Sequence, residues 1–203
     1  MLLKLYSPKI LTIIFDTQEE LTKSFCRVQE YYESPEFKDK IFTLGQYRKW
    51  YIEKYGQWSY YTDWSGFNIP IKTLAPFNEG LFDPLLPEEV TLLEKIKENP
   101  EVEYIIATYT EARADVMPHE IAHAMFATNP EYRKSVLTLI NSYDLSELKK
   151  HILELGYSES VLEDECHAYI LESHEYLEDK KIKYPTELLV YLIDLKVYHS
   201  EVK

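Results

Sequence analysis

The second half of the chain reads as a series of helices, and this pattern limits the fold more than any other feature of the sequence. Apolar residues recur there at helical spacing, and proline or glycine interrupts the pattern at intervals. Pro130 separates the first two segments, and Gly156 stands where a glycine would cap the end of the third. The predicted helices cover residues 115–127, 131–143, 145–155 and 161–180, with a last one after Pro185.

The first half combines strands with helices. Residues 9–15, KILTIIF, are apolar and β-branched, and we expect the N-terminal segment around them to form a strand. Asp16 and Thr17 stand where a helix cap would stand. The helix that begins after them should end near Pro35, because the residue before a proline is kept out of the helical region. Two further elements are predicted, a helix over residues 86–100 and a short buried strand over residues 103–109.

Residues 37–82 are irregular and strongly aromatic, and they hold all three tryptophans, Trp50, Trp58 and Trp64. We interpret these rings as groups that hold a loop-rich region against the main body, since aromatic side chains dominate burial. A substrate-binding wall is the alternative. The predicted fold class is therefore α+β and mainly helical, with a short sheet. We expect a single domain over residues 1–203, with an aromatic-rich subregion over 1–100 and a helical core over 101–203.

The size and charge of the chain indicate which kinds of molecule it can bind. The chain has 203 residues, of which 45% are hydrophobic, so it is long enough to bury a substantial core. Its net charge of −13 argues against a nucleic-acid partner, because phosphate binding requires clustered Lys and Arg, and these residues are interspersed here with acids. The predicted partner classes therefore exclude nucleic acid.

Cysteine usage and the N-terminus bear on the compartment. Cys26 and Cys166 lie far apart in the sequence and have no neighbouring cysteine, so neither a disulfide framework nor a cysteine zinc cluster is indicated. A reducing compartment, the cytoplasm, fits this usage. Lys4, Pro8 and Lys9 interrupt the apolar N-terminal segment, which therefore predicts neither a signal peptide nor a membrane anchor.

The stretch MPHEIAHAMF contains the candidate chemistry. His119 and His123 are four residues apart, so on a helix their imidazoles lie on one face and can bind a single metal ion. Glu120 is turned about 100° from His119 and is predicted to accept a proton from a water molecule rather than to bind the metal. An H-E-x-x-H frame arises by chance in about one or two chains per hundred of this composition. Its apolar surroundings strengthen the prediction, because buried histidines need partners.

The frame HEIAH, followed downstream by a helix that reads Glu165, Cys166, His167, Ala168, Tyr169, resembles the gluzincin metallopeptidases of the zincin superfamily. The resemblance covers residues 104–176. It implies a zincin-like core in which His119 and His123 bind Zn²⁺, Glu165 is the third ligand and Glu120 is the general base and acid. The small Ala168 and Tyr169 suit a close helix crossing beside Glu165. Three other residues remain candidates for the third ligand, namely Glu163, Asp164 and His167.

The same resemblance suggests roles for neighbouring residues. Zincins place an edge strand, able to pair with an extended peptide, where YIIATY stands at residues 104–109. Glu172 or Asp115 is a candidate to hold a ligand imidazole by its free N–H group, and Tyr169 or Tyr157 is a candidate donor to a developing oxyanion. The remaining histidines, His151, His174 and His199, have no metal spacing and are interpreted as ordinary helix residues.

The function expected from these features is zinc-dependent hydrolysis of a peptide bond, with a peptide or protein as the substrate and no membrane partner. Two alternatives stay open. One is a zincin-like binding or regulatory module without peptidase activity, which would have a closed metal site. The other is a zinc amidohydrolase that acts on an amide other than a peptide.

Overall fold

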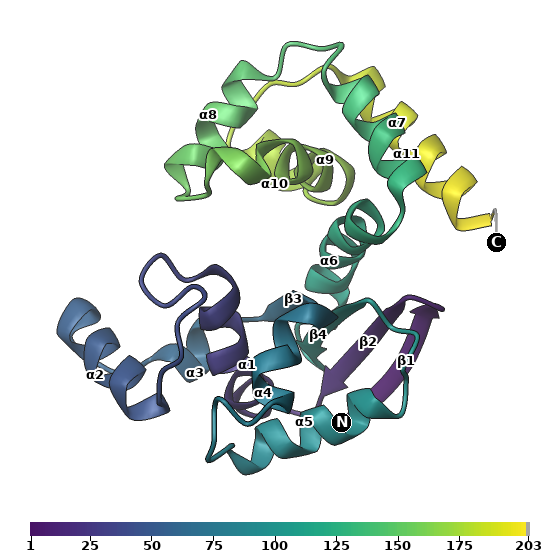
Figure 1. The fold of residues 1–203 in the computed structure, drawn as a ribbon. Helices are drawn as coiled ribbons and strands as arrows, with labels where there is room; N and C mark the ends of the chain where they lie inside the picture. The colour runs from purple at the N-terminus through teal and green to yellow at the C-terminus, as the bar shows by residue number, and fades with distance from the viewer. Residues whose placement is uncertain (202–203) are drawn as a thin grey trace. The chain divides into compact units, whose positions relative to one another are not determined.

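The computed structural model describes residues 1–201 and is an α+β fold, 61% helical, with one small mixed sheet (Figure 1). The chain divides into two compact units. The first covers Met1–Met117, and the second covers the chain from Pro118 onward. The boundary therefore lies about one helical turn into the predicted motif helix, rather than at residue 100. The expectation that both units belong to one domain stays a prediction.

The sheet of the first unit has four strands, in the order β1-β2-β4-β3. Antiparallel pairing joins β1 to β2 and β3 to β4, whereas β2 and β4 run parallel. The strands are β1 (Leu2–Ser7), β2 (Ile10–Phe15), β3 (Gly66–Pro70) and β4 (Tyr104–Tyr109). The N-terminal segment is thus a hairpin that turns at Pro8 and Lys9, not one strand. All six residues of β2 are buried, as expected of a strand paired on both sides.

The position of β4 contradicts one expectation. Its backbone pairs with β2 on one side and with β3 on the other, so β4 is an interior strand. The prediction that YIIATY forms an exposed edge strand for a peptide is therefore wrong. A run of buried apolar residues is typical of an interior strand, because both faces and both edges are covered.

Helix α1 (Gln18–Glu33) follows the sheet hairpin and confirms the predicted caps. The Thr17 side chain accepts a hydrogen bond from the backbone N–H of Glu20 at 3.2 Å. The helix ends at Ser34, directly before Pro35. Leu21, Phe25 and Val28 are fully or almost fully buried, and the helix packs on β2, β3 and β4.

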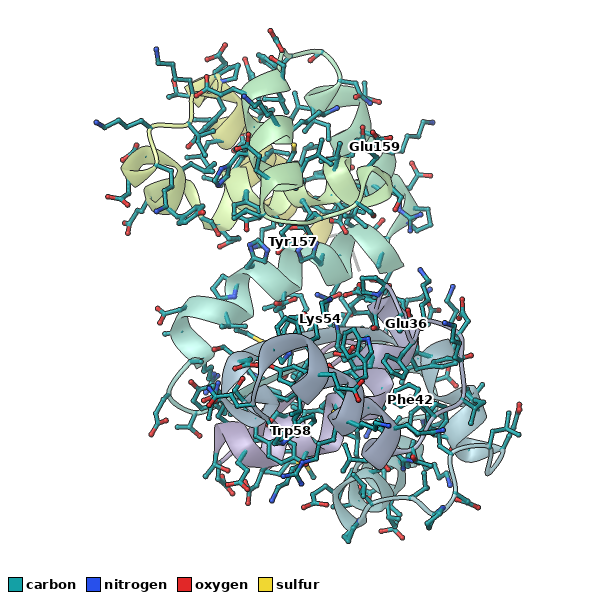
Figure 2. All side chains as sticks on the ribbon, turned by 90° about the vertical axis from the view of Figure 1, so that its left-hand side faces the viewer. Glu36, Phe42, Lys54, Trp58, Tyr157 and Glu159 are labelled. Carbon is teal, nitrogen blue, oxygen red and sulfur yellow. The ribbon has the colours of Figure 1, made fainter. Side chains whose placement is uncertain are left out.

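The aromatic stretch contains more regular structure than the sequence predicted. Its elements are α2 (Leu44–Tyr55), α3 (Tyr60–Asp63), β3, the 3₁₀ turn η1 (Ile71–Leu74) and α4 (Ala75–Asn78). The rings pack against one another: Tyr60 is fully buried, stacks on Trp58 at 5.7 Å and meets Tyr47 edge-on at 5.5 Å. Figure 2 shows Phe42 and Trp58 among the side chains of this unit.

Helix α5 (Pro87–Lys97) is bound to α1 through a buried ion pair. The Arg27 guanidinium donates to both carboxylate oxygens of Glu89, with one N–O distance of 2.8 Å, and to the backbone oxygen of Phe82 at 2.9 Å. Both side chains are at most 3% exposed. Since each charge has partners, the pair satisfies groups that would otherwise be costly to bury.

The second unit is a cluster of helices around α9. Helix α6 (Arg113–Thr128) begins in the first unit and continues into the second. The others are α7 (Pro130–Ile140), α8 (Ser146–Glu154), η2 (Glu159–Val161), α9 (Leu162–Glu172), α10 (His174–Asp179) and α11 (Thr186–Glu201). Helix α9 packs against α7, α8, α10 and α11, which explains why six of its residues are buried.

Most predicted helices of this unit are confirmed to within a few residues, and Gly156 follows α8 with a left-handed φ of +100°. The helix predicted over 161–180 is wrong in one respect. It begins with the turn η2, ends at Glu172 and restarts at His174, with Ser173 between the two parts. Across residues 1–201, none of the helices combines the length and the apolar content that crossing a lipid bilayer requires.

Candidate metal centre

Helix α6 presents the two motif histidines on one face. Their Nε2 atoms lie 3.1 Å apart, and their rings meet edge-on with centroids at 4.8 Å. Ala122 and Ala124 are fully buried beside them, so the helix is anchored through its small apolar residues. The His123 side chain is 6% exposed and the His119 side chain 19%, which leaves the pair accessible mainly at His119.

Helix α9 brings Glu165 to the same point. One carboxylate oxygen lies 3.7 Å from Nε2 of His123, and the other lies 4.0 Å from Nε2 of His119. In a tetrahedral zinc site with bonds of 2.0 to 2.2 Å, neighbouring ligand atoms are about 3.3–3.6 Å apart. The observed separations bracket this value. Among the described residues, His119, His123 and Glu165 form the cluster with the composition and spacing of a metal site.

Each histidine has a partner on its other ring nitrogen. Nδ1 of His123 lies 3.0 Å from a carboxylate oxygen of Asp164, and Nδ1 of His119 lies 3.3 Å from the hydroxyl oxygen of Ser173. Metal-binding histidines generally have such a partner, which holds the ring and sets which nitrogen carries the proton. Both Nε2 atoms are thereby directed toward one point.

The other candidates for the third ligand make different contacts. Glu163 pairs with Lys149 at 3.2 Å. Asp164 contacts His123 on the ring nitrogen that faces away from the cluster. His167 is fully buried, and its Nε2 atom lies 2.7 Å from the hydroxyl group of Tyr132. The geometry therefore brings Glu165, rather than these three residues, to the two Nε2 atoms.

The groups that hold the ligand imidazoles were not those named from the sequence. Glu172 forms an ion pair with Lys196, and Asp115 is exposed at the start of α6. Asp164 and Ser173 contact the histidines instead. No pattern in the sequence indicated Ser173, because it lies inside the stretch that was predicted to be one continuous helix.

The two histidines differ strongly in pKa. Burial, followed by the charge of His123, lowers the pKa of His119 to about 3. Burial is also the largest influence on His123 and lowers its pKa, but the hydrogen bond and charge of Asp164, with the charges of Glu165 and Glu120, raise that pKa to about 9. His123 therefore takes up a proton much more readily than His119, whose Nε2 atom lies 3.1 Å from that of His123. A metal ion has to displace this proton, because it binds neutral imidazole.

Glu120 and two tyrosines lie in the same electrostatic environment. Glu120 is half-buried, and its negative charge acts on both His123 and Tyr157. Tyr169 meets the His119 ring edge-on at 5.3 Å. Burial raises the pKa of Tyr157, and the charge of Glu165 and a hydrogen bond with Tyr169 raise it further. Tyr157, labelled in Figure 2, lies in the loop between α8 and η2 and is 39% exposed.

Of the remaining histidines, His151 and His199 make ordinary side-chain contacts, whereas Nδ1 of His174 is buried and has no hydrogen-bond partner. His151 lies 3.1 Å from the hydroxyl group of Tyr176, and the His199 ring packs on Tyr132. A separate, open surface cavity of about 450 Å³ runs along α7. Its lining comprises Pro130, Arg133, Lys134, Leu137, Thr138 and Asn141. None of the clustered donors lines it, so the cavity has no part in the metal centre.

Comparisons with protein-family models, with curated proteins and with solved structures found no match for this chain. The assignment of a function therefore depends on the geometry of the centre itself.

Proposed function

We propose that this chain is a zinc-dependent hydrolase that cleaves peptide bonds, with a metal centre of the gluzincin type inside a zincin-like core. One observation carries the proposal. Two imidazole nitrogens from α6 and a carboxylate from α9 converge at spacings of 3.1, 3.7 and 4.0 Å, although the two helices are far apart in sequence. If the H-E-x-x-H frame were accidental, there would be no reason for a carboxylate from another helix to lie beside its two histidines.

The donor set suits zinc. Two histidines and one carboxylate are the protein ligands of one common class of catalytic zinc site. A zinc ion held by His119, His123 and Glu165 would supply a Lewis acid that polarises a carbonyl group and makes a water molecule more acidic. Asp164 and Ser173 hold the rings, so the ligands are arranged before the ion arrives.

Glu120 is the proposed general base. It follows His119 directly and is therefore turned about 100° around the helix, beside the ligands rather than among them. Its carboxylate accepts a proton from the attacking water molecule and passes it to the leaving amine. Tyr157 and Tyr169 are the proposed donors to the oxyanion, because tyrosine hydroxyl groups are protonated at neutral pH and the pKa of both is raised further.

The number of protein ligands favours an enzyme over a closed binding module. The cluster has three members within residues 1–201, and the His119 side chain keeps 19% of its surface exposed. Structural zinc sites have four protein ligands, whereas catalytic sites keep one position for water or substrate. The proposed substrate is a peptide or protein. The proposed compartment is the cytoplasm, in line with Cys26 and Cys166, which are both free and buried.

The first test is the metal content of the purified protein after dialysis against metal-free buffer. About one zinc per chain in the wild type, and much less in His123→Ala, is the expected result. His151→Gln is the matched control, because His151 contacts Tyr176 rather than the cluster. A wild-type protein that holds no zinc, and takes up none when zinc is added, would refute the proposal.

A further inference from the structure

A row of buried polar groups continues outward from His123. Beyond His123 lies Asp164, whose Oδ1 atom is 3.0 Å from Nδ1 of His123 and 3.7 Å from Nδ1 of His167. Beyond His167 lies Tyr132 on α7, with its hydroxyl group 2.7 Å from Nε2 of His167. His167 and Tyr132 are both fully buried. Neither residue has a role in the proposed hydrolysis.

Packing holds the His167 ring in place. The ring stacks on Phe126 from α6, with centroids 5.7 Å apart and an angle of 27° between planes. Tyr132 meets it edge-on at 5.4 Å. Because these contacts leave the imidazole little freedom to turn, its two nitrogens keep their directions, Nε2 toward Tyr132 and Nδ1 toward Asp164.

Hydrogen-bonding chemistry then determines where the proton of His167 lies. The Asp164 carboxylate only accepts hydrogen bonds, so Nδ1 of His167, the ring nitrogen that faces it, has to carry a proton. In a neutral imidazole the other nitrogen, Nε2, is then the acceptor, and the Tyr132 hydroxyl group, 2.7 Å away, donates to it. Nδ1 therefore presents an N–H group to the Asp164 carboxylate.

One buried atom supports this direction. Nδ1 of His167 has no hydrogen-bond partner and lies 3.7 Å from Oδ1 of Asp164, which is longer than a hydrogen bond. Buried polar atoms are rarely left without partners. A carboxylate oxygen has two lone pairs, so Oδ1 of Asp164 can accept from both His123 and His167.

We propose that Tyr132, His167 and Asp164 form a positioning chain for the metal ligand His123. Tyr132 sets the tautomer of His167, and His167 donates a hydrogen bond to Asp164. Asp164 also accepts a hydrogen bond from Nδ1–H of His123, so the lone pair of Nε2 of His123 is left for the metal. None of the three residues touches the metal. The inference rests on the proposed metal centre, and it adds two residues, His167 and Tyr132, that reach the centre only through others.

The test combines zinc affinity with the tautomer of His167. Zinc affinity is measured by competition with a chelator for the wild type, Asp164→Asn, Tyr132→Phe and the double variant. Tyr132→Phe removes only a hydroxyl group, and Tyr143→Phe in the same unit is the matched control. The positions of the histidine protons are read from ¹⁵N chemical shifts of the imidazoles in the metal-loaded wild type and in Tyr132→Phe.

We expect Asp164→Asn to lower zinc affinity by about 10- to 100-fold. Tyr132→Phe should lower zinc affinity by less. It should have no further effect in the Asp164→Asn background, because both changes interrupt the same row of hydrogen-bonded side chains. His167 should carry its proton on Nδ1 in the wild type and populate both tautomers in Tyr132→Phe. Tyr143→Phe should leave affinity and tautomer unchanged.

The positioning chain would be overturned, with the metal centre left intact, by a wild-type His167 that carries its proton on Nε2 or by a Tyr132→Phe variant that binds zinc as tightly as the wild type. Independent, multiplicative losses from Asp164→Asn and Tyr132→Phe would also overturn it. Failure of the wild type to bind zinc is a different outcome, since it would refute the metal centre and, with it, the inference.

Discussion

The hydroxyl oxygen of Ser173 lies 3.3 Å from the Nδ1 atom of His119. Ser173 occupies the break between α9 and α10, with a backbone φ of −128° and ψ of 26°, and its N–H group still donates to Tyr169 at 2.9 Å. The break turns the chain where a continuous helix was predicted. As a result, a small polar side chain meets His119, the more exposed of the two proposed histidine ligands.

Ser173→Ala should therefore weaken zinc binding by about tenfold, because the His119 ring loses the group that holds it. The measurement is chelator competition on the purified protein. Ser142→Ala, at an exposed position after α7, is the control and should bind zinc like the wild type. Equal affinity in Ser173→Ala and the wild type would show that the contact does not orient His119.

Removal of the metal should destabilise the second unit. A ligand that binds only the folded state stabilises it by about 2.7 kcal/mol when present at a hundred times its dissociation constant. Zinc should therefore raise the thermal unfolding midpoint of the wild type, and a chelator should reverse the change. Calorimetry with and without zinc measures this effect. In His123→Ala the midpoint should not respond to zinc, whereas in His151→Gln it should respond as in the wild type.

Glu120→Gln should separate metal binding from catalysis. The variant keeps all three proposed ligands but has no carboxylate to accept the proton, so we expect full zinc content and a rate of peptide hydrolysis lower by about 10²- to 10⁴-fold. Elemental analysis and a broad peptide and amide screen are the measurements. Glu131→Gln, an exposed acid at the start of α7, is the control. Full activity in a zinc-loaded Glu120→Gln sample would exclude Glu120 as the base.

The first unit contains a buried acid that should make its stability depend on pH. Burial raises the pKa of Glu30, although hydrogen bonds with Tyr47, Ser34 and Tyr60 lower it in part. The folded state therefore holds this proton more tightly than the unfolded state does. The contribution of Glu30 to stability is complete below the unfolded pKa of about 4.3 and is lost as the pH rises through the folded value.

Glu30→Gln keeps a carbonyl oxygen for the tyrosine hydroxyl groups and removes the charge. We expect the free energy of unfolding of wild type to fall, relative to that of the variant, between pH 4 and pH 8. Urea denaturation across this range measures the difference. Glu53→Gln, at an exposed position on α2, should follow the wild type. Parallel pH profiles for wild type and Glu30→Gln would contradict the prediction.

Local signals predicted much of the fold. Thr17 and Pro35 delimit α1 because capping and proline sterics act within a few residues. The same reasoning placed α5, β4 and most helices of the second unit. It did not find β3, and it took the hairpin of β1 and β2 for one strand, since strand pairing depends on more than local sequence. The local reading of β4 as a short buried strand is confirmed, whereas the edge-strand position implied by the family resemblance is wrong.

The sequence by itself determined the chemistry available at the centre. The spacing of His119 and His123 on a helix forces their imidazoles onto one face. The family resemblance pointed to Glu165 as the third ligand, while Glu163, Asp164 and His167 stayed open. Only the tertiary structure decided which groups support these ligands. Asp164 and Ser173 reach the histidines because α9 packs beside α6 and breaks at Ser173, and side-chain direction after such a break depends on packing between helices rather than on local sequence.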